Sequence, residues 1–310
     1  MTDWREGPIA LLGADGMLGR QWRHWLGASD SPSPREGAGG GWRATAPHGD
    51  AQAAHRVHCF TYPTLDFEHD DTLLRIFDVR PRLVINCAAY TNVDLAESEP
   101  DKADRINAAA VGTLASLCRD RGVTLVHYST DYVFDGRAAA PYPVDAPTNP
   151  INVYGRTKLR GEQLLQSSGC DHLLIRTSWL YAPWARNFVR TIAAAAKAKP
   201  ELRVVNDQRG RPTSTASLVD ITARLLDRDC RGTFHATDDD ACTWFDFATA
   251  IAAFANPACK IVPCTTAEFP RPAPRPSYSV LDLSKTSAAI GPLTPWPDAL
   301  QKVLPHLQPA

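Results

Sequence analysis

The sequence predicts an α/β fold built on a doubly wound parallel sheet, and three observations support this fold class. Residues 8–12 form a short apolar run that leads through a glycine-rich turn into a helical pattern at 20–26. Residues 83–89 form a continuous apolar run, which is typical of a parallel strand buried on both faces. Strand and helix patterns alternate through the first 180 residues, and this alternation indicates a parallel sheet covered by helices.

The turn after the first strand reads Gly13-Ala14-Asp15-Gly16-Met17-Leu18-Gly19. Glycines let the backbone approach a pyrophosphate, and the N-terminus of the following helix offers free N–H groups and the positive end of its dipole. The spacing is G-x-x-G-x-x-G rather than G-x-G-x-x-G. We interpret it as a phosphate-binding turn, with a tight turn that binds nothing as the alternative.

Residues 28–55 differ in composition from the rest of the chain. They contain Ser31-Pro32-Ser33-Pro34 and a glycine-rich run at 37–41, with few large apolar residues. Such segments bury too little apolar surface to order themselves. We expect a flexible surface insertion here.

The remaining elements follow from apolar periodicity and end signals. Pro100 is placed to open a helix that runs to 121, and Gly122 is placed to end it. A loop at 136–150 with four prolines leads to the helix that carries Tyr154, and Thr243 caps a helix that ends at 255. The other expected helices span 70–78, about 185–198, 217–226 and 297–304, and the other expected strands span 57–62, 123–128, 172–177, 202–205 and 232–235. The tail from Pro263 on is proline-rich, and no internal repeat is visible.

Composition excludes several classes of function. The chain has 310 residues and a formal net charge of -1, without a basic stripe, so we expect no nucleic-acid partner. Its apolar runs are shorter than a membrane span, and the first residues lack the apolar core of a signal peptide. The eight cysteines form no Cys-x-x-Cys motif. We therefore expect small buried thiols in a reducing cytoplasm rather than disulfides or zinc sites.

Tyr154 and Lys158 are the strongest chemical signal. The i, i+4 spacing places both side chains on one helix face. An ammonium beside a phenol favours the phenolate and lowers its pKa, which suits a proton donor or acceptor near neutral pH. The hydroxyl of Thr130, at the end of the strand at 123–128, is placed to bind the same substrate oxygen. These three groups fit hydride transfer to or from a carbonyl, although a solvated helix face is the alternative for Tyr-x-x-x-Lys alone.

Motifs along nearly the whole chain outside 28–55 resemble one family. They are Gly13 to Gly19, Asn86 to Asp94 with Ala96-Glu97, Ile106-Asn107, Tyr128 to Gly136, Pro150 to Lys158, Arg176 to Trp179, Asp207-Gln208, Pro212-Thr213, Arg275-Pro276 and Tyr278-Ser279. In this order they resemble the extended short-chain dehydrogenase/reductases, and within them the dTDP-4-dehydrorhamnose reductases. Each motif is weak alone, and together they are specific.

The resemblance implies a division into two domains. Residues 1–175 would form a Rossmann-like NAD(P)-binding domain, to which the segment 200–235 returns. Residues 176–199 and 236–310 would form a smaller C-terminal α/β domain that binds substrate.

The resemblance also implies site residues. Tyr154 would be the proton donor, Lys158 would bind the nicotinamide ribose and tune Tyr154, and Thr130 would complete the catalytic set. The implied cofactor-binding residues are Gly13, Gly16, Met17, Leu18, Gly19, Asp66, Phe67, Ala88, Ala89, Tyr90, Thr91, Tyr128, Tyr154 and Lys158. The implied substrate-binding residues are Val93, Thr130, Asp131, Tyr154 and Trp179.

Two departures from the family pattern affect the ligands. The second strand ends in Phe60-Thr61-Tyr62, without an acid for a ribose 2′-hydroxyl or an arginine for a 2′-phosphate. We therefore expect both NADPH and NADH to serve. Some family members use a glutamate soon after Pro-Thr for a magnesium-bridged dimer, whereas Ser214-Thr215-Ala216-Ser217 follows here, so we expect no metal.

The favoured function is reduction of the C4 keto group of dTDP-4-dehydro-L-rhamnose to dTDP-L-rhamnose by an NAD(P)H-dependent enzyme. The alternatives are another nucleotide-sugar 4-ketoreductase, a dehydratase or an epimerase of the same superfamily, or a non-catalytic regulatory subunit like the beta subunit of methionine adenosyltransferase. Dehydratases typically continue Thr with Asp-Glu, whereas Tyr132 follows Asp131 here, so dehydration is disfavoured. The resemblance leaves open whether the protein forms a homodimer, which nucleotide the substrate carries and which 4-keto sugar is reduced.

Overall fold

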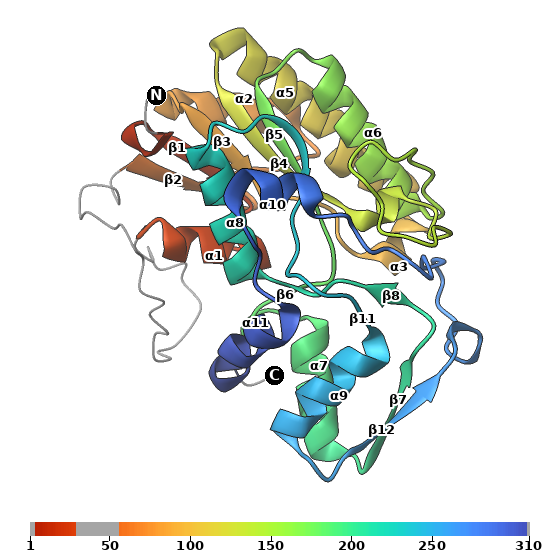
Figure 1. The fold of residues 1–310 in the computed structure, drawn as a ribbon. Coiled ribbons are helices and arrows are strands. Elements are labelled where there is room, and N and C mark those ends of the chain that lie inside the picture. Colours follow the sequence, from red (N-terminus) through yellow and green to blue (C-terminus); the bar gives the residue numbers. More distant parts are fainter. Residues whose placement is uncertain (1–3, 29–55, 309–310) are drawn as a thin grey trace.

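A parallel sheet of six strands forms the centre of the larger lobe (Figure 1). The computed structural model describes residues 4–28 and 56–308, so the expected insertion lies, apart from Ala28, outside the described residues. The strands pair in the order β10-β5-β4-β3-β1-β2, all parallel. They are β1 (Ile9–Leu12), β2 (Val57–Phe60), β3 (Leu83–Asn86), β4 (Thr124–Thr130), β5 (His172–Thr177) and β10 (Gly232–His235). The predicted doubly wound fold is confirmed.

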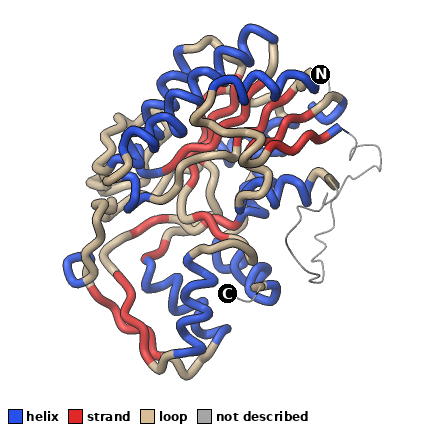
Figure 2. Tube along the Cα trace, turned by 180° about the vertical axis from the view of Figure 1, so that it is seen from behind, coloured by secondary structure: helices blue, strands red, loops and turns tan. Residues whose placement is uncertain are grey.

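Helices cover both faces of this sheet (Figures 1 and 2). One face carries α1 (Met17–Trp25), α8 (Thr215–Asp227) and α10 (Ser284–Ile290); the other carries α2 (Asp70–Leu74), α5 (Ala110–Arg121) and α6 (Val153–Ser167). Successive strand residues point to opposite faces. Ile9 and Leu11 therefore pack with α1 and α8, while Ala10 and Leu12 pack with α2 and α5.

The helix expected from Pro100 to residue 121 contains a wider turn. It consists of α4 (Pro100–Asp104), a π-helical turn η4 (Arg105–Ala109) and α5. Gly122 ends α5 in the left-handed conformation, as the sequence predicts. Such π turns are frequent at functional sites. Here the turn carries Asn107, whose side chain accepts a hydrogen bond from the Tyr90 amide at 2.9 Å and donates to the Tyr90 carbonyl at 3.0 Å.

The smaller lobe packs three helices around its own apolar core (Figure 1). These are α7 (Phe188–Ala198), α9 (Trp244–Ala255) and α11 (Trp296–Val303). Three two-stranded sheets complete the lobe and its junction with the sheet: β7 (Glu201–Val205) with β12 (Lys260–Cys264), β6 (Leu180–Tyr181) with β9 (Thr213–Ser214), and β8 (Arg209–Gly210) with β11 (Cys242–Thr243). Thr243 caps α9 with a full capping box, as predicted.

Several boundaries differ from the sequence-based prediction. Helix α7 begins at Phe188 rather than near 185, because the Asn187 side chain caps it. We did not predict β12, which begins before the proline-rich tail and extends past Pro263, or α10 within that tail. Two short helical turns, α3 (Val93–Ala96) and η5 (Asp131–Val133), follow β3 and β4. Within residues 4–28 and 56–308, none of the helices is both long enough and apolar enough to cross a bilayer.

Candidate active site

A cavity of about 1050 Å³ lies between the carboxyl edge of the sheet and the smaller lobe. The ends of β1, β2, β3, β4 and β5 all contribute to its wall. The chain order reverses between β1 and β3, where open α/β sheets place their ligands. The predicted site residues that line the cavity are Gly13, Gly16, Met17, Leu18, Asp66, Phe67, Ala88, Ala89, Thr91, Val93, Tyr128, Thr130, Asp131, Tyr154, Lys158 and Trp179. The structure thus brings together residues from positions 13 to 179.

The three glycines of the first turn have different tasks. Gly13 has φ +68°, and a Cβ there would lie 2.8 Å from the Ala88 amide nitrogen, so only glycine fits at this close approach. Gly16 precedes α1 without a side-chain cap, which leaves the first N–H groups of the helix without a side-chain partner at that position. A Cβ at Gly19 would lie 2.1 Å from the Gly13 carbonyl oxygen. Gly19 is absent from the cavity wall, and its contribution is the close packing of α1 against the turn.

Tyr154, Thr130 and Asp131 form one polar cluster at the bottom of the cavity. Asn152 caps α6 by accepting a hydrogen bond from the Gly155 amide at 2.7 Å, and this fixes the helix turn that carries Tyr154. The Thr130 hydroxyl donates a hydrogen bond to Asp131 Oδ1 at 3.0 Å, and it lies close enough to the Tyr154 hydroxyl to influence the pKa of that group. Burial, together with the nearby Asp131 charge, raises the pKa of Tyr154 to about 12. Burial also raises the pKa of Asp131 to about 6.

The contacts of Lys158 differ from the contact with Tyr154 that the i, i+4 spacing predicts. Its amine donates to the Tyr128 carbonyl at 2.6 Å and lies 3.4 Å from His127 Nε2. Lys158 is 2% exposed, and burial lowers its pKa to about 8. The expected lowering of the Tyr154 pKa by a lysine charge is therefore wrong for this structure, because burial dominates both groups and the amine is bound to backbone.

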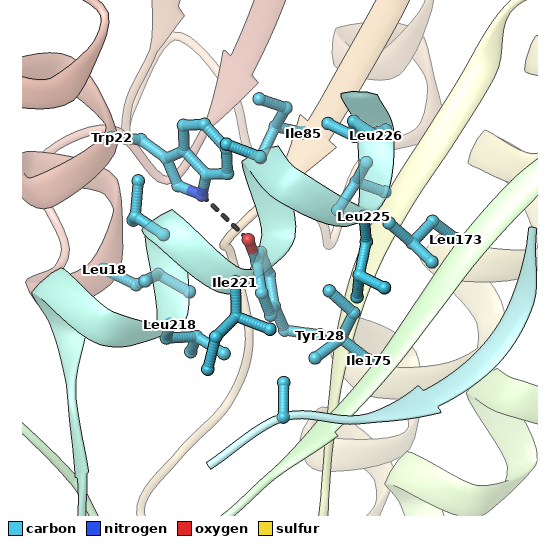
Figure 3. Close-up of a cluster of buried hydrophobic side chains, with 14 of the residues drawn as sticks. Leu18, Trp22, Ile85, Tyr128, Leu173, Ile175, Leu218, Ile221, Leu225 and Leu226 are labelled. Carbon is cyan, nitrogen blue, oxygen red and sulfur yellow. Dashed lines mark hydrogen bonds between the residues drawn. The ribbon is translucent and has the colours of Figure 1, made fainter. Parts of the chain in front are cut away.

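Two predicted tyrosines turn their hydroxyls away from the cavity. Figure 3 shows the Tyr128 ring within the apolar cluster between the sheet and helices α1 and α8. Its hydroxyl accepts from Trp22 Nε1 at 2.8 Å and donates to Thr222 at 3.1 Å. Tyr90 is not part of the cavity wall, and its hydroxyl donates to Glu99 at 2.8 Å. Only the ring of Tyr128 and its backbone remain near the cavity.

An aromatic wall closes the cavity on the side of the smaller lobe. The Trp179 indole stacks on Trp244, with ring centroids 3.6 Å apart and an interplanar angle of 10°. A Cβ at Gly210 would lie 2.6 Å from Trp179, so the indole lies against the β8 backbone. Trp179 adopts φ +48°, an uncommon conformation for a bulky residue that clusters at binding sites. Trp179 is therefore held in place from both sides.

Sequence reasoning missed several residues of the cavity wall. Trp244 and Arg186 come from the smaller lobe, and no local motif marks them. Thr177 and Ser129 each carry a buried hydroxyl that has no hydrogen-bond partner among the described residues. Their positions at the ends of β5 and β4 were the available signal, because strand ends at this edge point to ligands. Further residues of the wall are Asp15, Phe60, Thr61, Tyr62, Leu65, Glu68, Asn86, Cys87, Lys102, Ile106, Tyr132, Ser178 and Leu180.

Comparison with known proteins covers both lobes and the cavity. The family model described as RmlD substrate binding domain matches residues 8–308. The dTDP-4-dehydrorhamnose reductase of Escherichia coli (strain K12) is 37% identical over 283 residues, which are 86% of this chain and 94% of that protein. The crystal structure of a dTDP-4-dehydrorhamnose reductase from Clostridium acetobutylicum has a TM-score of 0.84 and 35% identity, covering 97% of this chain and 99% of its own. That of Bacillus anthracis, in complex with NADP, has a TM-score of 0.82 and 31% identity, covering 96% and 98%.

Proposed function

Because the chain belongs to the dTDP-4-dehydrorhamnose reductase family, we propose that it reduces the C4 keto group of dTDP-4-dehydro-L-rhamnose to give dTDP-L-rhamnose. The single observation that carries this proposal is that Thr130 of β4 lines one cavity together with Tyr154 and Lys158 of α6. A half-buried acid and a neighbouring hydroxyl can bind and protonate one carbonyl oxygen.

The residues present fit a nicotinamide dinucleotide. The glycine turn closes onto Ala88 so tightly that a Cβ at Gly13 is excluded, and the uncapped start of α1 suits a diphosphate. The buried, unpartnered hydroxyls of Ser129 and Thr177 offer bonds to a polar group deeper in the cavity. When bound, the reduced nicotinamide of NADPH or NADH supplies a hydride to the carbonyl carbon. Asp66 and Phe67 would border the adenine, and Ala89 and Thr91 would line the cofactor groove.

Side chains of this protein supply the proton and position the cofactor and the substrate. Tyr154 holds its proton at neutral pH, because its pKa is about 12, and delivers it to the C4 oxygen. The Thr130 hydroxyl, which donates to Asp131 in this structure, would turn its proton to the same oxygen and orient it. Lys158 fixes the cofactor ribose near Tyr154. Trp179, Val93 and Asp131 bind the sugar.

The domain division follows the same logic. Residues 1–175 would carry the cofactor, together with α8 and β10 of the segment 200–235, which pack onto the sheet. Residues 176–199 and 236–310 would carry the sugar nucleotide. The eight cysteines are free thiols, which supports a reducing cytoplasm as the place of the reaction.

The neighbouring activities lack the groups that they need. A dehydratase needs a second carboxylate beside Asp131, whereas Tyr132 occupies that position, and its ring packs edge to face on Tyr154 with centroids 5.8 Å apart. A regulatory subunit needs no proton donor, whereas Tyr154, Thr130 and Lys158 all line the cavity here.

The test is an assay of the purified protein with dTDP-4-dehydro-L-rhamnose and each reduced cofactor. We expect loss of NAD(P)H absorbance in step with formation of dTDP-L-rhamnose. A matched reaction with the UDP-linked keto sugar tests the nucleotide. Tight cofactor binding without turnover of either sugar would contradict the proposal and favour a regulatory subunit.

A further inference from the structure

A buried chain of three polar side chains lies behind the candidate catalytic cluster. Asn86 ends β3, His127 lies in β4 beside it, and Lys158 reaches them from α6. They are 1%, 0% and 2% exposed. Asn86 Nδ2 lies 3.1 Å from His127 Nδ1, and His127 Nε2 lies 3.4 Å from Lys158 Nζ. The proposed reduction gives His127 no task.

The orientation of the Asn86 amide follows from its second contact. Asn86 Oδ1 accepts a hydrogen bond from the Ala88 amide at 3.0 Å. A backbone N–H can only donate, so the oxygen must face Ala88 and the NH2 group must face His127. His127 Nδ1 is therefore an acceptor. Its neutral ring then carries the proton on Nε2.

The ring is neutral because charging it here is costly. Burial, with the Lys158 charge as a second cause, lowers the pKa of His127 well below its usual value. Nε2–H consequently points at an amine that is itself a donor when charged. Among the residues that the structure describes, the Tyr128 carbonyl, at 2.6 Å, is the one acceptor left for Lys158.

We propose that His127 is a positioning residue that Asn86 locks in the Nε2–H tautomer, so that it presents a donor rather than an acceptor to the Lys158 amine. The ring offers the charged Lys158 no acceptor, so the ammonium donates to the Tyr128 carbonyl instead. Because the ammonium lacks a partner at His127, the ring also favours the uncharged amine. This inference rests on the proposed function, in which Lys158 serves the reduction.

The groups around the pair define what else acts on Lys158. Glu162 lies one turn further along α6 and favours the ammonium, but Arg176 from β5 binds that carboxylate at 2.7 Å. His172 of β5 lowers the pKa of His127, and Asp131 of η5 raises the pKa of Tyr154. With the pKa of Lys158 at about 8, activity that depends on the ammonium falls as the pH rises through this value.

Asn86→Asp should reverse the tautomer of His127 with a minimal change in the shape of the side chain. One carboxylate oxygen still accepts the hydrogen bond of the Ala88 amide. The other oxygen faces His127 in place of the NH2 group of asparagine. Because this oxygen can only accept, His127 Nδ1 must carry the proton. Nε2 then becomes an acceptor for Lys158. The direct readout is the long-range ¹H–¹⁵N spectrum of the imidazole rings, with the His127 signal assigned by its loss in His127→Phe. We expect the proton on Nε2 in the wild type and on Nδ1 in the variant.

The second readout is the pH profile of kcat. In Asn86→Asp the alkaline limb should move up by about one pH unit, because the ammonium gains an acceptor. The new carboxylate also acts by charge, so the same substitution is made in the His127→Phe background. A tautomer effect disappears there, whereas a charge effect persists. Asn206→Asp, an exposed site in the smaller lobe, controls for net charge.

The outcomes are distinct. A proton on His127 Nδ1 in the wild type overturns the inference even where the variants fail to fold. The inference is also overturned if Asn86→Asp moves the alkaline limb of the kcat profile equally with His127 present and in the His127→Phe background. Absence of keto-sugar reduction by the wild type would instead contradict the proposed function, and the ring spectrum would still report the tautomer.

Discussion

At the scale of single residues, burial decides the charge of the groups in the active site. Tyr154 keeps its proton because its surroundings disfavour a phenolate, and Lys158 gives up its proton more readily because they disfavour an ammonium. A reductase needs a protonated donor at the start of the reaction, so a raised tyrosine pKa is compatible with this direction of catalysis.

Asp238 shows the same effect away from the active site. It is fully buried next to the start of α8, where Oδ2 accepts from the Ser214 amide at 2.8 Å. Oδ1 has no partner among the residues that the structure describes. Burial raises its pKa to about 7. The folded protein thus binds a proton that the unfolded chain releases near pH 4, so the free energy of unfolding falls as the pH rises from about 4 to about 7.

Asp238→Asn should remove this pH dependence. Asparagine keeps an acceptor for Ser214 and carries no charge. We expect the stability of the variant relative to wild type to increase by roughly 1–4 kcal/mol between pH 4.5 and pH 8. Urea unfolding at several pH values measures this difference. Asp240→Asn, at an exposed neighbouring site, is the control, and a flat difference for Asp238→Asn would contradict the assignment.

At the scale of elements, α6 is placed by its contact with the π turn η4. Gly161 is the point of contact, because a Cβ there would lie 2.1 Å from the Asn107 carbonyl oxygen. The Asn107 side chain also bonds to Thr157 of α6 at 3.2 Å. The position of Tyr154 and Lys158 therefore depends on a glycine that is not part of the cavity wall.

Gly161→Ala should displace α6. We expect a loss of roughly 1–3 kcal/mol in unfolding free energy, as for other overpacked sites, and a fall in kcat. Gly112→Ala is a matched control on the facing helix, because the atoms nearest to its Cβ would belong to the Leu164 side chain, at 3.2 Å, rather than to backbone. Circular dichroism melts and kcat measure both variants, and equal behaviour of the two would show that the close contact does not position α6.

The end of β2 bears on cofactor choice. Thr61 and Tyr62 line the cavity there and carry no charge. We therefore predict that both NADPH and NADH are used, with an affinity ratio below about a thousand, or roughly 4 kcal/mol. Titrating protein fluorescence with each cofactor measures the ratio. A larger ratio would reveal a selecting residue, and Lys102 in the cavity wall would be the first to replace.

At the scale of the whole molecule, the active site is formed where the two lobes meet. The sheet supplies Thr130 and the glycine turn, and the smaller lobe supplies Trp244 and Arg186. Trp184 connects the two, because its Nε1 donates to the Met17 carbonyl at 3.1 Å. In the proposed function, sugar recognition would thereby be separated from cofactor binding in space.

This separation predicts the effect of Trp179→Ala. The KM for the sugar nucleotide should rise by about 100-fold, since a buried aromatic anchor contributes a few kcal/mol, while the cofactor Kd should stay nearly unchanged. Trp244→Ala should show a smaller loss in the same direction, because Trp244 supports the Trp179 ring. Phe254→Ala, at an exposed position on α9, is the control. Equal losses for sugar and cofactor would assign Trp179 to the structural core.

The sequence predicts those parts of the molecule that depend on neighbouring residues. The glycine turn, the sheet and the helix with Tyr154 follow from local patterns. The Lys158 contact with a backbone carbonyl leaves no trace in residue types, and Trp244 lies 65 positions after Trp179. Strand β12 was missed because Pro263 suggested a loop. Within residues 4–28 and 56–308, however, β12 pairs with β7 alone, and its free edge tolerates a proline.

The most direct test of the proposed mechanism is kcat of Tyr154→Phe with dTDP-4-dehydro-L-rhamnose and NADPH, measured beside the cofactor Kd. The substitution removes only the hydroxyl that carries the proton. We predict a fall in kcat by roughly 10²–10⁴ with the cofactor Kd essentially unchanged. Near-normal turnover in this variant would contradict the assignment of Tyr154 as the proton donor.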